Sequence, residues 1–383
     1  MSRAERAAVG GAPVAVTVVT GAASAAAARA AYRALRRHPP AGEQTWTRTN
    51  HRGELVTLLE GPAVAVGAIT AEVIGAAVAA RLSGRPRAGI ATESQRHDFP
   101  ERTLRSHASL AMAVAGGGAL GFGVLDDLAG SGKRRGLKGH LGALAHGEVT
   151  TGTVKLAGLA ATGLAGGLLL GGRRSDALVN AGLIAGGANL LNLFDLRPGR
   201  AVKVAALSAG LIAAGGAGGP DRSAGLAAVA APLGAGLALL PEDLAERAML
   251  GDAGANALGA MLGAAAAGSL PRPARVGLLA GIVALTVASE KISFTKVIEA
   301  VPTLRRLDML GRRPAPLDAT VAAADGPRAA PAAEGDQPDA AQVIRLGGRR
   351  GGRHRRVGSG EDRVRSINWI FGFFFRALAR QQP

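Results

Sequence analysis

Residues 154–172, VKLAGLAATGLAGGLLLGG, indicate the fold: apart from Lys155 near the start, the stretch holds only Ala, Gly, Leu, Val and one Thr. Such a stretch approaches the ~20 apolar residues that a helix needs to cross a lipid bilayer. Similar stretches occupy residues 55–80, interrupted only by Glu60 and Glu72, and residues 202–219. The sequence therefore predicts an all-α, multi-pass membrane protein.

The composition of the whole chain supports the same prediction. Only 3% of the 383 residues are aromatic, so the chain lacks the bulky side chains that fill the cores of soluble domains. It has no cysteine, which excludes disulfides, thiolate nucleophiles and zinc sites built on Cys. The formal net charge is +17, but the basic residues are spread over short loops between apolar segments, where they meet anionic lipid. We therefore expect no nucleic-acid partner.

Apolar windows bounded by charged residues or turn formers predict a bundle of about nine to ten transmembrane helices. The nine spans that can be placed are 11–34, 57–80, 107–125, 154–172, 177–194, 202–219, 223–240, 254–270 and 274–289. Small residues dominate all of them. They suit close helix packing in lipid, but a general Ala and Gly bias of the genome explains them equally well.

The distribution of Lys and Arg predicts the orientation in the membrane. If the first span ends inside the cell, one face receives the basic segments 35–56, 126–153, 195–201, 241–253 and everything after 290. The positive-inside rule makes this the cytoplasmic face of the cell membrane. The segment 81–106 is also rich in Arg but falls on the opposite face, which argues against this orientation.

The composition changes after Arg313 and predicts three regions. Residues 1–313 form the transmembrane domain, and 314–362 are typical of a disordered basic linker rich in Pro and Ala. Residues 363–383 combine Arg with the aromatic residues Trp369, Phe371, Phe373, Phe374 and Phe375. That segment is too short to cross a bilayer and suits an amphipathic helix in the headgroup region. An accessory tail that only tethers the protein is the alternative.

Carboxylates next to spans are informative because burying an unpaired charge in a membrane is costly. The segment GFGVLDD ends the third span with two adjacent carboxylates, Asp126 and Asp127. Adjacent carboxylates repel each other and stay ionised together only when water or a cation compensates them. Mg²⁺ suits them, because it prefers oxygen ligands and is usually held by one or two carboxylates together with substrate phosphates. A solvated helix end is the alternative explanation.

Two further polar segments fall on the same face. In NLLNLFD, which ends the fifth span, Asn189, Asn192 and Asp195 recur at a spacing of three and share one face of a helix. In MLGDAGAN, which opens the eighth span, glycines around Asp252 let a backbone approach a ligand closely. A helix cap and a turn would explain these segments singly. Three such segments at the membrane boundaries of one face predict a functional site there.

In this order, the three segments resemble those of the polyprenyl-phosphate aminosugar-1-phosphate transferases. This superfamily includes the phospho-N-acetylmuramoyl-pentapeptide transferase and the undecaprenyl-phosphate N-acetylglucosamine-1-phosphate transferase. The resemblance covers roughly residues 35 to 313. It implies a Mg²⁺-dependent transfer of a sugar 1-phosphate from a UDP-sugar to a polyprenyl phosphate, with release of UMP. The reaction would take place at cytoplasmic loops, in the synthesis of peptidoglycan or another cell-envelope polysaccharide.

The resemblance also implies roles for single residues. Catalytic roles fall on Asp126, Asp127 and Asp252: the first two hold or deprotonate the lipid phosphate, and Asp127 and Asp252 are the Mg²⁺ ligands, with Asp252 the main one. The substrate-binding residues, which line the nucleotide pocket or supply a basic group, are Asn189, Asn192, Asp195 and Lys155.

The chain departs from the family where DLRPGR follows the fifth span in place of Asp-Gly-Leu-Asp-Gly. Pro198 replaces a carboxylate there, and Arg197 and Arg200 are additional. Because arginine forms bidentate bonds to phosphate, we expect at least one of them, in the first place Arg200, to bind a diphosphate or a charged sugar. Contact with anionic lipid is the alternative.

Such departures leave two other functions open. One is a catalytically silent relative that binds lipid-linked intermediates or acts as a membrane scaffold. The other is a transporter of an anionic solute, although transporters place their charges near the bilayer midplane and within inverted repeats. Here the acidic residues stand at span ends, which favours the transferase.

Overall fold

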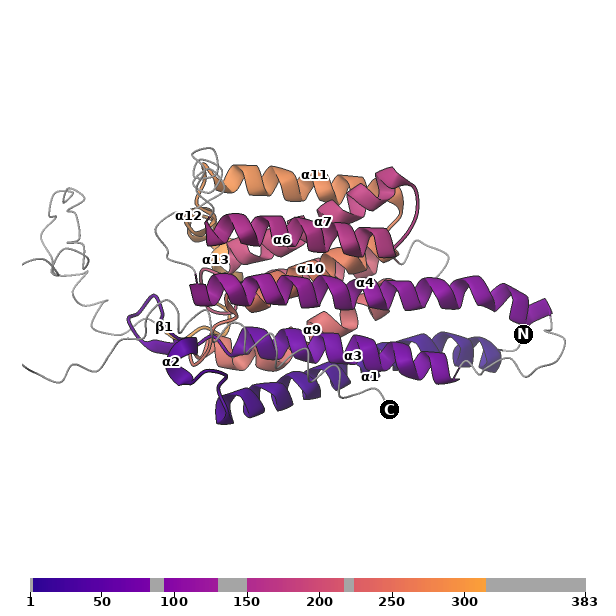
Figure 1. Ribbon diagram of the computed structural model, residues 1–383, viewed down its shortest axis with the longest axis horizontal. Coiled ribbons are helices and arrows are strands. Elements are labelled where there is room, and N and C mark those ends of the chain that lie inside the picture. Colours follow the sequence, from indigo (N-terminus) through magenta and orange to yellow (C-terminus); the bar gives the residue numbers. More distant parts are fainter. Residues whose placement is uncertain (1–2, 83–92, 130–149, 217–223, 315–383) are drawn as a thin grey trace, which may run out of the picture. The chain divides into compact units, whose positions relative to one another are not determined.

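Each of the nine predicted spans overlaps one helix of the computed structural model, which describes residues 3–82, 93–129, 150–216 and 224–314 (Figure 1). In chain order these helices are α1 (Arg3–Arg37), α3 (Glu60–Leu82), α4 (Glu93–Ala129), α6 (Thr151–Leu169), α7 (Arg174–Phe194), α8 (Arg200–Gly216), α9 (Ala224–Leu244), α10 (Gly251–Ser269) and α11 (Arg272–Ser289).

Within the described ranges, six helices are long and apolar enough to cross a membrane: α3, α4, α6, α7, α9 and α11. The protein is therefore an all-α, multi-pass membrane protein, as predicted. Large apolar side chains are exposed on these helices, such as Leu168 on α6, Leu178 on α7 and Val283 on α11. Such side chains suit contact with lipid. Helices α1, α8 and α10 are not among these six, so the count of nine to ten spans stays a prediction.

Helix α10 lies at the centre of the bundle and contacts α3, α4, α6, α7, α8 and α9. Every residue from 253 to 267 is buried. A Cβ atom on Gly259 would lie only 2.2 Å from the carbonyl oxygen of Gly187 on α7, so the two backbones touch at this crossing. Small residues are thus required here for packing, whatever the bias of the genome.

The remaining helices surround α10. Helix α1 packs on α3 and α9, α4 on α3 and α6, α7 on α6 and α11, and α8 on α9. Leu183 of α7, Ala267 of α10 and Ile282 of α11 form a small apolar cluster on one side. These contacts hold the ends of α4, α6 and α7 close to the first turn of α10.

One end of the bundle carries short elements that the hydropathy pattern does not predict. They are α2 (Glu43–Trp46), the antiparallel strands β1 (Thr47–Thr49) and β2 (Leu55–Thr57), α12 (Phe294–Ala300) and α13 (Pro302–Met309). Figure 1 shows them gathered at one end, which we call the hairpin end. The hairpin is tied to the segment before α10, because the Met249 N–H donates to the Thr57 carbonyl at 2.9 Å.

The start of one span differs from the predicted one. Helix α4 begins at Glu93, well before the predicted start of its span at residue 107, so part of the predicted loop 81–106 is helical. Charged residues end an apolar window, but many of them are good helix formers and do not end a helix. All but the first residue of the predicted linker 314–362, and the whole predicted interfacial helix 363–383, lie outside the described residues.

Candidate functional site

The three polar segments that predict a site meet at the hairpin end. Asp126 and Asp127 lie in the last turn of α4, Asp195 follows α7, and Asp252 lies in the first turn of α10. Lys155, in the first two turns of α6, connects two of them: its Nζ lies 2.7 Å from Oδ2 of Asp126 and 2.6 Å from Oδ2 of Asp252. The predicted convergence of the Asp pair with Asp252 is therefore confirmed.

Asp126 and Asp252 share the single cation Lys155. The side chain of Lys155 is 13% exposed, and those of Asp126 and Asp252 are 17% and 22% exposed, so the cluster is largely withdrawn from solvent but not sealed. The two carboxyl groups lie close together, because both contact the same ammonium group. Carboxylates this close repel each other unless a proton or a cation compensates them. One ammonium balances only one of the two charges, which leaves the pair suited to a further cation.

The carboxylate of Asp127 accepts hydrogen bonds from the backbone at the start of α10. Its Oδ1 accepts the backbone N–H of Asp252 at 3.0 Å, and its Oδ2 accepts that of Ala253 at 2.9 Å. The carboxylate of Asp195 lies near the backbone N–H of Gly251. Asp127 therefore caps the start of α10, where free N–H groups and the helix dipole favour negative charge. This cap fixes the end of α4 to α10.

Glycines allow the end of α4 to approach the start of α10 closely. A Cβ atom on Gly123 of α4 would lie 2.5 Å from the carbonyl oxygen of Asp252 and 2.6 Å from Cα of Ala253. Gly251 has a φ of 63°, in the left-handed region that favours glycine, and the chain turns there into α10. The glycines of the first and third polar segments thus bring the backbones of α4 and α10 together.

We expect Gly123→Ala to lower the melting temperature, because the added methyl group must push α10 away from α4. Overpacking of a tight contact costs about 1–3 kcal/mol. Gly117→Ala on the same helix is the matched control, since a Cβ atom on Gly117 would meet no neighbouring atom within 4 Å. There alanine should be neutral or stabilise by up to about 1 kcal/mol through its helix propensity. Equal melting temperatures of the two variants in one detergent would contradict the packing role of Gly123.

The two asparagines of the second segment lie where the sequence predicts them. Asn189 and Asn192 belong to the last two turns of α7, on the way to Asp195, and both are partly exposed. Lys155 stands at the acidic cluster, as the resemblance implies. The substrate-binding roles of these residues stay predictions.

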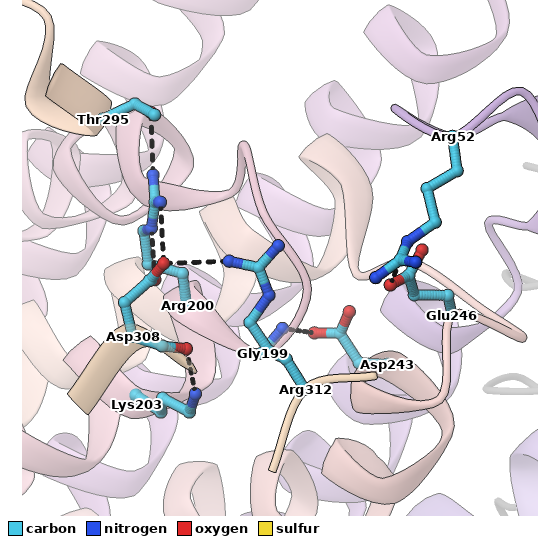
Figure 2. A network of polar contacts seen from close by, with 9 residues as sticks. All are labelled: Arg52, Gly199, Arg200, Lys203, Asp243, Glu246, Thr295, Asp308 and Arg312. Carbon is cyan, nitrogen blue, oxygen red and sulfur yellow. Dashed lines mark hydrogen bonds and ion pairs between the residues drawn. The ribbon is translucent and has the colours of Figure 1, made fainter. Parts of the chain in front are cut away.

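The predicted phosphate-binding role of Arg200 requires a correction. Its guanidinium binds the Asp308 carboxylate through Nε at 2.7 Å and Nη2 at 3.1 Å, and it donates to the Thr295 hydroxyl at 2.9 Å (Figure 2). Asp308 also accepts a hydrogen bond from Arg312 at 2.9 Å, and its backbone carbonyl accepts one from Lys203 at 2.6 Å. Arg200 is only 3% exposed, so the bidentate bond that we expected to a phosphate is made to a carboxylate of α13.

This ion-pair network holds α13 against the start of α8. Burial alone would raise the pKa of Asp308, but the hydrogen bond and charge of Arg200, together with Arg312 and Lys203, bring it below its ordinary value. A carboxyl group with a lowered folded-state pKa stabilises the fold above its unfolded-state pKa and loses this effect as the pH falls through the folded-state pKa. At neutral pH Asp308 is therefore charged, and its bonds to Arg200 and Arg312 hold α13 in place.

A small pocket of about 50 Å³ opens beside the acidic segments. Its walls come from the hairpin loop with His51, from the link between α7 and α8 with Asp195 and Arg197, and from the end of α9 with Asp243 and Glu246. The sequence does not predict this pocket, because a hairpin with strands of three residues each gives no periodic signal.

The donor set fits Mg²⁺ in part. Among the described residues, no group of three or more His, Asp and Glu side chains is arranged to hold a metal ion alone. The pair Asp126 and Asp252 still suits Mg²⁺, which is usually bound by one or two carboxylates with waters and phosphate oxygens as the other ligands. Both oxygens of Asp127 already accept N–H groups, and its role as a Mg²⁺ ligand stays a prediction.

Neither a protein-family model nor a curated protein matches the chain. The functional interpretation therefore depends on the side chains gathered at the hairpin end: a lysine between two carboxylates, a third carboxylate that caps α10, and the pocket beside them.

Proposed function

We propose that the protein is a Mg²⁺-dependent transferase, which moves a sugar 1-phosphate from a UDP-sugar to a polyprenyl phosphate and releases UMP. In this proposal the chain crosses the cell membrane nine or ten times, its hairpin end faces the cytoplasm, and its product enters cell-envelope polysaccharide or peptidoglycan synthesis. The observation that carries the proposal is the cluster of Asp126, Lys155 and Asp252. Both substrates are phosphate esters, and this cluster offers them an ammonium group and a carboxylate pair suited to Mg²⁺.

The location of the cluster suits two substrates of opposite solubility. Asp126 ends one membrane-spanning helix and Lys155 begins the next, so the cluster lies at a membrane boundary. The phosphate of a lipid carrier lies at the same boundary, whereas a nucleotide sugar arrives from water. Helices α4 and α6 thus offer a meeting point that neither the bilayer core nor a soluble loop would provide.

In the proposed reaction, an oxygen of the polyprenyl phosphate attacks the phosphorus atom that carries the sugar. The bond from that phosphorus to the bridging oxygen breaks, and UMP leaves with the bond electrons. Phosphoryl transfer chiefly needs positioning and neutralised charge. Lys155 supplies fixed positive charge, and the fully ionised lipid phosphate attacks without transferring a proton. Bound Mg²⁺, held by Asp126 and Asp252, would neutralise charge on the diphosphate.

The proposal is tested with purified protein in lipid nanodiscs, polyprenyl phosphate and a panel of UDP-sugars. We expect UMP and a lipid-linked sugar to form in equal amounts with at least one donor, and only when Mg²⁺ and the lipid are both present. Chelation by EDTA should stop both products. UMP release without a lipid product would indicate hydrolysis instead, and no release with any donor would contradict transferase activity.

Two observations favour a second candidate, a catalytically silent relative that binds a lipid-linked intermediate or acts as a scaffold. Both oxygens of Asp127 are engaged by the backbone of α10, and Pro198 stands where the family has a carboxylate. Such a protein would bind polyprenyl phosphate in nanodiscs and release no UMP. Measuring lipid binding alongside UMP release therefore separates the two candidates.

A further inference from the structure

Arg197 lies in the link between α7 and α8, and Arg200, three residues later, begins α8, but their surroundings differ. Arg200 is buried and bound to Asp308. Arg197 is partly exposed and lines the pocket at the hairpin end. Among the residues that the structure describes, its guanidinium has no hydrogen-bond or ion-pair partner. A group with five N–H donors and a permanent charge is thus available to a ligand of the pocket.

Arg197 differs from the other arginines near this pocket because it forms no ion pair with a described side chain. His51, on the pocket wall, lies close enough to Arg52, Arg197 and Arg312 to feel the charge of all three. Arg52 binds Glu246 at 3.0 Å, and Arg312 binds the aspartate of α13 at 2.9 Å (Figure 2). Arg197 is the one of the three without a carboxylate among the described side chains.

Two carboxylates of the pocket wall are engaged elsewhere. Asp243 accepts the backbone N–H of Gly199 at 3.0 Å, and Asp195 lies near that of Gly251. Neither forms an ion pair with Arg197. Asp195 also relates the pocket to the acidic cluster, because the residue after Gly251 is Asp252, so a ligand in the pocket lies beside the proposed reaction centre.

We propose that Arg197 is the anion-recognising residue of this pocket and that it binds a phosphate group. The guanidinium fork matches two phosphate oxygens at once. The pocket of about 50 Å³ gives a phosphate group access to this guanidinium. The inference rests on the proposed function where the phosphate belongs to a UDP-sugar. The phosphate of an anionic lipid headgroup offers the same chemistry, and the experiment distinguishes the two sources.

The test measures the binding of UDP, UMP and inorganic phosphate to the full chain in nanodiscs of zwitterionic lipid. Arg197→Ala should weaken UDP binding by about tenfold or more, since a hydrogen bond to a charged group is lost. Arg197→Lys should bind UDP with an affinity between the two, because it keeps the charge but not the fork. The matched control is Arg306→Ala, which removes an exposed arginine of α13 outside this pocket.

The source of the phosphate follows from nanodiscs that contain phosphatidylglycerol. If this lipid competes with UDP, and if the competition is lost in Arg197→Ala, the phosphate belongs to a headgroup. If the lipid does not compete, the phosphate belongs to the nucleotide. Equal UDP affinity in wild type, Arg197→Ala and Arg306→Ala would overturn the inference, as would a wild type that binds none of the probes. Because UDP binding needs no turnover, the binding result does not depend on the outcome of the transferase assay.

His51 gives a second measurement that needs no change at Arg197. Burial lowers the pKa of His51 below 6.5, with Arg197, Arg312 and Arg52 acting in the same direction and Glu246 against them. A phosphate bound to Arg197 adds negative charge nearby, so the pKa of His51 should rise when UDP or inorganic phosphate is added. Histidine NMR, with His51→Gln to assign the signal, follows this shift. An unchanged pKa at saturating UDP would contradict binding at Arg197.

Discussion

Asp252→Asn should remove nearly all transfer activity and leave the protein folded. The amide keeps the size of the side chain but loses the charge that balances a divalent cation, and loss of such an electrostatic contact costs about a thousandfold in rate. The capping of α10 by Asp127 remains, because it uses the backbone N–H of Asp252 and not its side chain. UMP release with the best donor of the panel measures the activity, and the melting temperature measures folding.

Asp176→Asn is the control for this variant. Asp176 lies in the first turn of α7, at the opposite end of that helix from Asp195, and binds Arg272 at 3.0 Å. Its replacement removes an aspartate of the same kind far from the acidic cluster, so activity should stay at the wild-type level. Wild-type turnover in Asp252→Asn would exclude this side chain as a Mg²⁺ ligand.

The nine long helices were predictable because each overlaps an apolar window. What surrounds each of them was not predictable. Helix α10 and helix α11 look alike in sequence, as two stretches without charged residues at their centres. The first is surrounded by six helices and buried, and the second leaves most of its surface exposed. An apolar window indicates that a segment is withdrawn from water. It does not show whether lipid or other helices surround the segment.

The meeting of Asp126 with Asp252 followed from the count of spans, because alternating helices place both at the same end of the bundle. The partner of Arg200 could not be derived in this way. Arg197 and Arg200 are equivalent in the local sequence, and only Asp308, 108 residues away from Arg200, decides which of the two is buried. Long-range ion pairs carry no local pattern. The sequence therefore predicted a substrate-binding role for Arg200, whereas the fold uses this residue in an ion pair within the protein.

Lys155→Met should destabilise the protein in the absence of divalent cations, and Mg²⁺ should restore much of the loss. The variant leaves Asp126 and Asp252 facing each other without a cation, and removing one partner of a largely buried ion pair costs about 2–4 kcal/mol. Lys296→Met, on the exposed surface of α12, should change little under either condition. Melting temperatures with Mg²⁺ and with EDTA give the comparison. Because Lys155 already balances one of the two charges, the wild type should gain less from Mg²⁺ than the variant does. An equal gain in all three proteins would argue against a cation site between Asp126 and Asp252.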